Sequence, residues 1–67
     1  MIAISLNGEP RQFDEHTTVA QLLQQLGYAG KRVAVEQNGA IAPKSQHAQA
    51  RIGAGDRLEI VVAVGGG

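Results

Sequence analysis

The sequence predicts an α+β fold in which one amphipathic helix packs on one face of a mixed β-sheet. Three observations lead to this prediction. The 67 residues suffice for a single domain, because a second domain would lack the length for its own core. One stretch has the apolar period of a helix, and several others alternate with the period of two that strands show. The helical stretch lies between the second and third predicted strands.

The first two strands are predicted to form a hairpin. Apolar and other residues alternate over residues 2–6, as expected for a half-buried strand. The dipeptide Asn7-Gly8 follows at once and favours the type I′ turn of a two-residue hairpin. Residues 9–13 then return as a second strand. Pro10 has no N–H to donate to a ladder, so we expect this strand at a sheet edge.

The helix begins after Thr18, because Thr18 and Gln21 have the spacing of a capping box. Gly27 is expected to end it, in the left-handed conformation that glycine adopts after helix C-termini. The apolar residues in between recur at helical spacing and form one stripe that should face the sheet. They are Val19, Leu22, Leu23 and Leu26.

The second half of the chain is predicted to supply three more strands. Residues 33–37 and 40–42 form the second hairpin, which is joined by another Asn-Gly turn. Residues 43–52 have no clear period, apart from a helical turn near residues 44–47. After a glycine-rich turn, residues 57–64 form the longest strand. Apolar side chains on both faces near its end indicate a central position in the sheet.

The predicted order is therefore ββαβββ, with the first and last strands side by side in the middle of the sheet. This arrangement is the β-grasp, the ubiquitin-like roll. We assign residues 1–64 to this single domain and residues 65–67 to a flexible C-terminal glycine tail.

Composition excludes several classes of function. The absence of Cys removes disulfides, thiolate metal sites and a cysteine nucleophile. A net charge of +0 and only two aromatic residues, Phe13 and Tyr28, argue against a nucleic-acid partner. No apolar run approaches the roughly 18 residues of a membrane span, and no signal peptide is recognised. We therefore expect a cytoplasmic protein with no membrane partner.

The glycine run Gly65-Gly66-Gly67 is the most informative feature of the sequence. Glycine loses more entropy on ordering than any other residue and packs nothing, so the run adds nothing to the fold. It offers a slim backbone that ends in a free carboxylate. Three extended residues reach about 10 Å, enough to enter a narrow channel in a partner. The alternative is a frayed terminus without function.

Several stretches together resemble the ThiS family, the ubiquitin-like sulfur carriers of thiamine biosynthesis. The resemblance covers essentially the whole chain, with a third terminal glycine where two are usual. The stretches that carry it are Leu6-Asn7-Gly8-Glu9, Thr18-Val19-Ala20-Gln21-Leu22-Leu23, Val33-Ala34-Val35, Asn38-Gly39, Pro43-Lys44-Ser45, Gly55-Asp56-Arg57-Leu58-Glu59-Ile60-Val61 and the terminal glycines.

This resemblance implies a carrier and not an enzyme. An adenylyltransferase of the ubiquitin-activating type would use ATP to join Gly67 to AMP, with Gly65 and Gly66 in the enzyme's channel. Persulfide sulfur from a cysteine desulfurase would displace AMP and leave a thiocarboxylate on Gly67. Thiazole synthase would receive that sulfur. The carrier itself would bind no cofactor and no metal.

Other functions fit the same residues. The chain could carry sulfur for molybdopterin synthesis or tRNA thiolation, which need the same chemistry at Gly67 with a different acceptor. It could also be a ubiquitin-like interaction module or a conjugating tag that forms isopeptide bonds. A small hydrolase is the remote alternative, because no nucleophile, base and acid have a recognisable spacing.

The open face of the sheet is a second candidate site. The alternation predicts that small side chains point away from the helix, namely those of Ala3, Ser5, Ala34, Val61 and Ala63. The alternative is that these residues have no binding role, because single exposed apolar residues are common on protein surfaces. Because the cluster lies beside the tail, we predict that Val61, Ala63 and the adjoining Val64 bind the partner.

Three charged or metal-binding candidates are weaker. His16 follows two acidic residues, but acidic groups before a helix are better explained by its N-terminal dipole. His47 has no partner at zinc spacing and is predicted to be a solvated loop residue. Lys31 and Arg32 are predicted to be a solvated loop end, with contact to an acidic partner surface as the less favoured reading.

Overall fold

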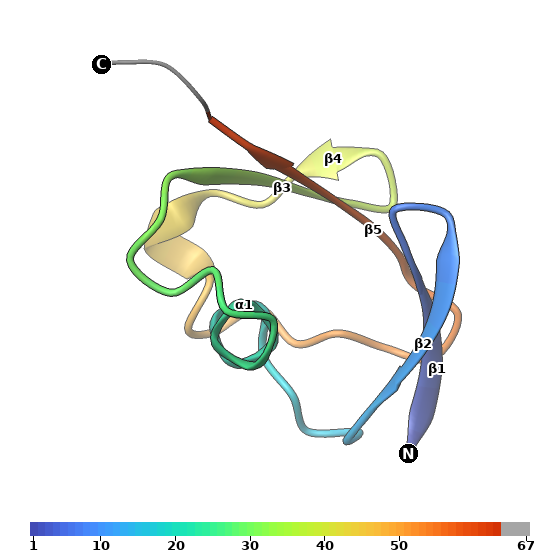
Figure 1. Cartoon of the computed structure of the whole chain (residues 1–67). Coiled ribbons are helices and arrows are strands. Elements are labelled where there is room, and N and C mark those ends of the chain that lie inside the picture. The colour runs from blue at the N-terminus through green and yellow to red at the C-terminus, as the bar shows by residue number, and fades with distance from the viewer. Residues whose placement is uncertain (64–67) are drawn as a thin grey trace.

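The computed structural model describes residues 1–63, which form a five-stranded sheet crossed on one face by a helix (Figure 1). Val64, Gly65, Gly66 and Gly67 lie outside the described residues. In chain order the elements are β1 (Ile2–Leu6), β2 (Glu9–Phe13), α1 (Val19–Gln25), β3 (Val33–Gln37), β4 (Ala40–Ile41), the 3₁₀ helix η1 (Lys44–Gln46) and β5 (Arg57–Val62). No helix within residues 1–63 has the length and apolar character needed to cross a bilayer.

The strand order is β2-β1-β5-β3-β4, with β1 and β5 parallel and every other pair antiparallel. The first and last strands therefore lie side by side in the middle, as the sequence predicts. The edge position of β2 is also confirmed, and Pro10 lies opposite Ser5 of β1. This mixed sheet with one packed helix is a β-grasp fold.

Both hairpins turn on an Asn-Gly pair in the left-handed region. The φ angles are 50° and 83° at Asn7 and Gly8, and 54° and 86° at Asn38 and Gly39. Positive φ at both central residues defines the type I′ turn, whose twist matches that of the flanking strands. The two turns thus fix the register of β1 with β2 and of β3 with β4.

The helix begins with the predicted capping box. Gln21 N–H donates to the Thr18 hydroxyl at 3.2 Å, and Thr18 N–H donates to the Gln21 side-chain oxygen at 3.0 Å. These two bonds satisfy two of the amide groups that a helix start leaves without partners.

Residues 47–52, which have no period in the sequence, complete this helix start. Val19 N–H donates to the carbonyl of Ala50 at 2.8 Å, and Ala20 N–H donates to that of His47 at 2.9 Å. Ile52 is buried in the core and its N–H donates to Thr17. This irregular segment is therefore held by the hydrogen bonds that α1 requires at its N-terminus.

The helix ends in a Schellman motif. Gly27 has a φ of 86°, its N–H donates to Gln24, and Tyr28 N–H donates to Leu23. These two bonds satisfy carbonyls of the last turn. The motif turns the chain into the loop of residues 28–32, which leads directly to β3.

The core lies between α1 and the face of the sheet that it covers. Val62 of β5 is apolar but lies outside this core, because 38% of it is exposed. Among residues 1–63 its only strand partner is Val33 of β3, since β1 pairs with β5 no further than Leu58. The end of β5 therefore projects beyond the core. The buried apolar residues are Ile4, Leu6, Phe13, Val19, Leu22, Leu23, Val35, Ile52, Leu58 and Ile60.

Candidate functional site

The end of β5 is the point from which the chain continues toward the predicted sulfur site at Gly67. Ala63 N–H donates to the carbonyl of Arg32 at 2.9 Å, just before β3 begins. This bond fixes the last described residue against the β3 side of the sheet. Gly67, with Gly65, Gly66 and Val64, lies outside the described residues, so these four positions stay predictions.

Val61 and Ala63 lie on the surface, as their alternation predicts. Val61 is 61% exposed and stands opposite Ala34, which is also exposed. The side chains of Val61 and Ala34 thus share the open face of the sheet. Their exposure is confirmed, whereas their role in partner binding stays a prediction.

The open face of the sheet is not apolar throughout. Glu36 of β3 lies directly opposite Glu59 of β5, two residues before Val61. Like charges in this position destabilise a sheet. The exposed apolar pair of Ala34 and Val61 lies beyond these two carboxylates, at the end of the sheet next to Ala63. Strand register brings the two carboxylates together, and no local sequence signal reveals it.

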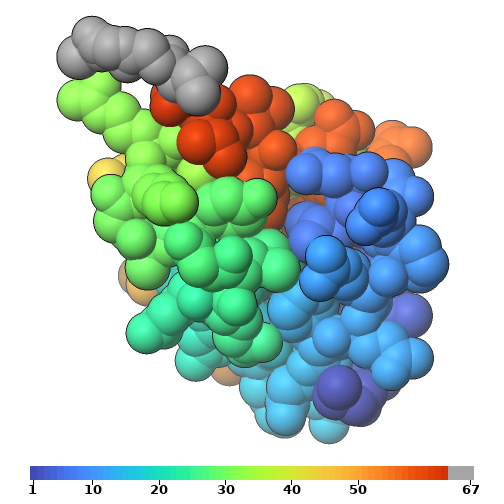
Figure 2. Space-filling model, in the orientation of Figure 1, coloured from blue at the N-terminus to red at the C-terminus, as the bar shows by residue number. Residues whose placement is uncertain are grey.

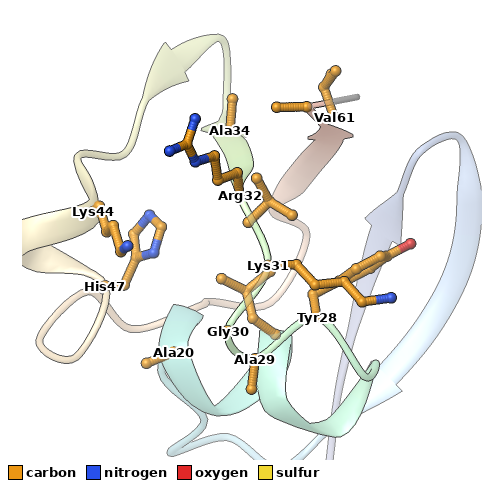
Figure 3. Close-up of a pocket in the computed structure, with 13 residues that line it drawn as sticks. Ala20, Tyr28, Ala29, Gly30, Lys31, Arg32, Ala34, Lys44, His47 and Val61 are labelled. Carbon is orange, nitrogen blue, oxygen red and sulfur yellow. The ribbon is translucent and has the colours of Figure 1, made fainter. Parts of the chain in front are cut away.

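A concave site of about 600 Å³ adjoins this end of the sheet (Figure 3). It lies between α1, the loop of residues 28–32, the ends of β3 and β5, and η1. We call this site the basic groove. Its described lining comprises Ala20, Leu23, Tyr28, Ala29, Gly30, Lys31, Arg32, Val33, Ala34, Lys44, His47, Val61 and Ala63.

Lys31, Arg32 and Lys44 line the basic groove, and no described lining residue is acidic. All three are exposed, which confirms the solvated loop end predicted for Lys31 and Arg32. In Figure 3, Arg32 and Lys44 extend on the η1 side, whereas Lys31 and Tyr28 extend the opposite way. Within residues 1–63, none of the three cations takes part in an ion pair.

His47 is buried and not solvated, so that prediction was wrong. Only 7% of it is exposed, and its Nε2 lies 2.9 Å from the carbonyl oxygen of Ala42. The turn that follows Pro43 places the ring beside Ala42, and the His47 backbone carbonyl accepts from Ala20 N–H of the helix. Its burial depends on this packing between distant segments, for which the sequence has no periodic signal.

Asp14 and His16 form a turn before the helix. The Asp14 carboxylate accepts from His16 N–H at 3.1 Å, and the Asp14 carbonyl accepts from Thr17 N–H at 3.1 Å. The first turn of α1 contains no acidic residue. Asp14 therefore stabilises the preceding turn instead of the helix dipole. Residues 1–63 place no three His, Asp or Glu side chains together in a metal-binding arrangement.

Asp56 organises the turn before β5. Its carboxylate accepts from Gly53 N–H at 2.7 Å, Gln37 at 2.9 Å and Asn38 at 3.0 Å. Burial raises the pKa of Asp56, but the hydrogen bonds from Asn38, Gln37 and Gly53 outweigh it and hold the pKa below its usual value. This cluster ties the second hairpin to β5 and has a structural role.

Comparisons with known proteins match this chain at the level of family. The model of the ThiS family matches residues 4–67. The chain is 50% identical over 62 residues to a thiazole synthase of Paramagnetospirillum magneticum, and 39% identical over 64 residues to one of Magnetococcus marinus. These matches cover 92% and 96% of the chain, but only 19% and 20% of the two relatives. The chain thus spans about a fifth of the length of either thiazole synthase.

Two further matches extend over nearly the whole of both proteins. An uncharacterized protein of Porphyra purpurea is 35% identical, with 98% of this chain and 93% of that protein covered. The crystal structure of the thiamine biosynthesis protein ThiS from Geobacter metallireducens superposes with a TM-score of 0.83 at 30% identity. That match covers 98% of this chain and 100% of the solved one.

Proposed function

Because this chain belongs to the ThiS family, we propose that it is a sulfur carrier of thiamine biosynthesis that holds sulfur at the carboxyl group of Gly67. The observation that supports this most strongly is the similarity to ThiS of Geobacter metallireducens over the full length of that protein. The glycine run after β5 supports it further, because a slim tail suits entry into an enzyme channel.

The proposed chemistry has two stages. A carboxylate is a poor electrophile, so a Gly67 oxygen first attacks the α-phosphorus of ATP and pyrophosphate leaves. The terminal sulfur of a persulfide, supplied by a cysteine desulfurase, then attacks the acyl carbon and AMP leaves. A thiol reduces the resulting acyl disulfide and releases the thiocarboxylate. The adenylyltransferase performs the first stage, and this chain is its co-substrate.

The folded body supplies binding energy that the tail lacks. Ordering each tail residue costs about 1–2 kcal/mol, so Gly65, Gly66 and Gly67 together cost about 3–6 kcal/mol. Contacts elsewhere on the body must offset this. We propose that the exposed end of the sheet at Val61 and Ala63 provides them, because apolar surface next to the tail gains free energy when a partner covers it.

We propose thiazole synthase as the acceptor of the sulfur. Two proteins with this name contain a segment similar to nearly all of this chain. This likeness favours thiazole formation over molybdopterin synthesis or tRNA thiolation. In this proposal ATP and the persulfide are used by the partner enzymes, and the chain binds no cofactor of its own. Its cytoplasmic location stays a prediction.

Intact-mass spectrometry tests the proposal. The chain is incubated with ATP, an adenylyltransferase, a cysteine desulfurase, cysteine and a thiol reductant. We expect the mass to rise by the difference between one sulfur and one oxygen atom, with the gain in the last peptide. A variant without Gly66 and Gly67 is the control and should not change. An unchanged mass of the full chain would contradict the proposal, and addition of thiazole synthase and its other substrates should reverse the gain.

A further inference from the structure

We propose that the basic groove is a docking site for a carboxylate-bearing segment of the adenylyltransferase. This inference rests on the proposed function, because it concerns the enzyme that acts on Gly67. It assigns a role to Lys31, Arg32 and Lys44, which the sulfur chemistry does not use. The carboxylates of the partner segment would pair with Arg32 and Lys44.

Charge complementarity is the first argument. The chain has six basic and six acidic residues, yet the charged residues of the described groove lining are all basic. Within residues 1–63, Arg32 and Lys44 make no ion pair with another part of the chain. An acidic segment would supply the missing partners, and Arg can bind a carboxylate through two parallel hydrogen bonds.

The shape of the groove is the second argument. Small or apolar residues lie between the cations, among them Ala20, Ala29 and Val33. Alanine and glycine leave the space of about 600 Å³ open, which is in the size range of ligand-binding sites in proteins. The fitting occupant is a peptide segment that carries an apolar side chain between or beside its carboxylates.

The position of the groove is the third argument. Ala63 lines the groove and donates a hydrogen bond to Arg32, so the chain continues toward Gly67 from the groove's edge. Figure 2 shows the end of β5 next to the loop of residues 28–32 on one surface. The four residues that follow Ala63, up to Gly67, can span at most about 14 Å. An enzyme that holds Gly67 therefore lies within reach of Arg32 and Lys44.

The adenylyltransferase is the proposed occupant of the groove, because it must capture the free carrier by diffusion before any sulfur is attached. The net charge of the chain is +0, so the molecule as a whole offers no attraction to an acidic enzyme. A local basic groove beside the tail accelerates and orients this encounter.

Charge reversal tests the inference. We compare Arg32→Glu, Lys44→Glu and their double variant with the unmodified chain, and measure Kd for the adenylyltransferase with ATP. The double reversal is expected to raise Kd by about tenfold or more at low salt. Raising the salt from about 0.05 M to 0.5 M should weaken binding of the unmodified chain. It should not weaken binding of the double variant, because salt screens the repulsion between its glutamates and the partner's carboxylates.

The matched control is Arg11→Glu combined with Arg51→Glu, which changes the net charge equally at exposed positions outside the groove. Its Kd should stay within about twofold of the unmodified value. The pair Arg32→Lys and Lys44→Arg should also retain binding, because it preserves both charges. Circular dichroism checks folding, and the two single reversals carry the test if the double variant does not fold.

The outcomes separate this inference from the proposed function. If Gly67 gains sulfur and the groove reversals bind as tightly as the unmodified chain, the docking inference is wrong and the carrier function stands. Equal weakening by the control also overturns the inference, since only net charge would matter. If the reversals weaken only the binding of thiazole synthase, the groove binds that enzyme, and docking of the adenylyltransferase in it is wrong. If the unmodified chain binds the enzyme but gains no sulfur, the proposed function fails.

Discussion

The side chain of Asn7 bonds to both backbone polar groups of Ile60. Its Oδ1 accepts from Ile60 N–H at 2.8 Å, and its Nδ2 donates to the Ile60 carbonyl at 3.3 Å. β1 ends at Leu6, so this turn residue extends the pairing of β1 with β5 beyond the end of the strand. The Asn7 side chain thus adds one more pair of hydrogen bonds between the two central strands.

Asn7→Gly is expected to lower the free energy of unfolding by about 1–3 kcal/mol, because both bonds to Ile60 are lost. Glycine adopts the φ of 50° at this position without strain, so the backbone of the turn is kept. Urea denaturation measures the change. Asn7→Asp keeps the acceptor at 2.8 Å and should lose less. Equal stability of Asn7→Gly and the unmodified chain would show that the two bonds contribute nothing.

The carboxylate of Asp56 should make stability depend on acid pH. Its pKa in the folded chain lies below the usual value of 3.8. The stabilisation is therefore fully present above pH 3.8 and is lost as the pH falls through the lowered folded-state pKa. We expect Asp56→Asn to be less stable at pH 7, with the difference narrowing below about pH 4. Thermal unfolding at several pH values gives the difference, and a gap that does not narrow in acid would contradict the pKa direction.

Val61→Asp should separate binding from folding. Val61 is 61% exposed, so the substitution should change the free energy of unfolding by no more than about 0.5 kcal/mol. Adenylation of Gly67 should fall, because an unpaired charge would be desolvated where the partner covers the sheet. Ile41→Asp is the matched control, since Ile41 is 65% exposed on β4. Equal effects of the two variants on adenylation would exclude a docking surface centred on Val61.

Gly27→Ala should destabilise the helix end by about 1–2 kcal/mol. A Cβ at Gly27 would meet no other described segment within 4 Å, so the loss arises from the local backbone conformation, with its φ of 86°, and not from a clash with a distant part of the chain. Gly27→Asn should lose less, because Asn tolerates the left-handed region better. Thermal melting distinguishes the variants, and an alanine variant as stable as the asparagine one would refute this explanation.

The features that the sequence predicts well are local ones. The two Asn-Gly turns, the capping box of Thr18 and Gln21, and the stop at Gly27 each involve residues within five positions of one another. Their hydrogen bonds and φ angles follow from the residue types. The central pair of β1 and β5 was also predictable, because both strands have strongly apolar alternation.

The features that the sequence hides depend on contacts between distant segments. His47 is buried by packing against the start of the helix, and Glu36 faces Glu59 through strand register. The basic groove combines Arg32 and Lys44, which come from a loop and a 3₁₀ turn without any periodic pattern. The charges of Lys31 and Arg32 predicted only a solvated loop end. The concave surface between Arg32 and Lys44 arises from the fold.

The parallel pairing of β1 with β5 also has a consequence for biosynthesis. Leu6 pairs with Leu58, so the middle of the sheet closes only after more than fifty residues have been made. Strand pairing across such a long sequence separation is slow to form. A chain that ends before Arg57 lacks β5, the strand that carries the buried residues Leu58 and Ile60. Shortened chains thus expose apolar core and become substrates for proteolysis. The domain can therefore fold only after β5, which lies close to the glycine run, has been synthesised.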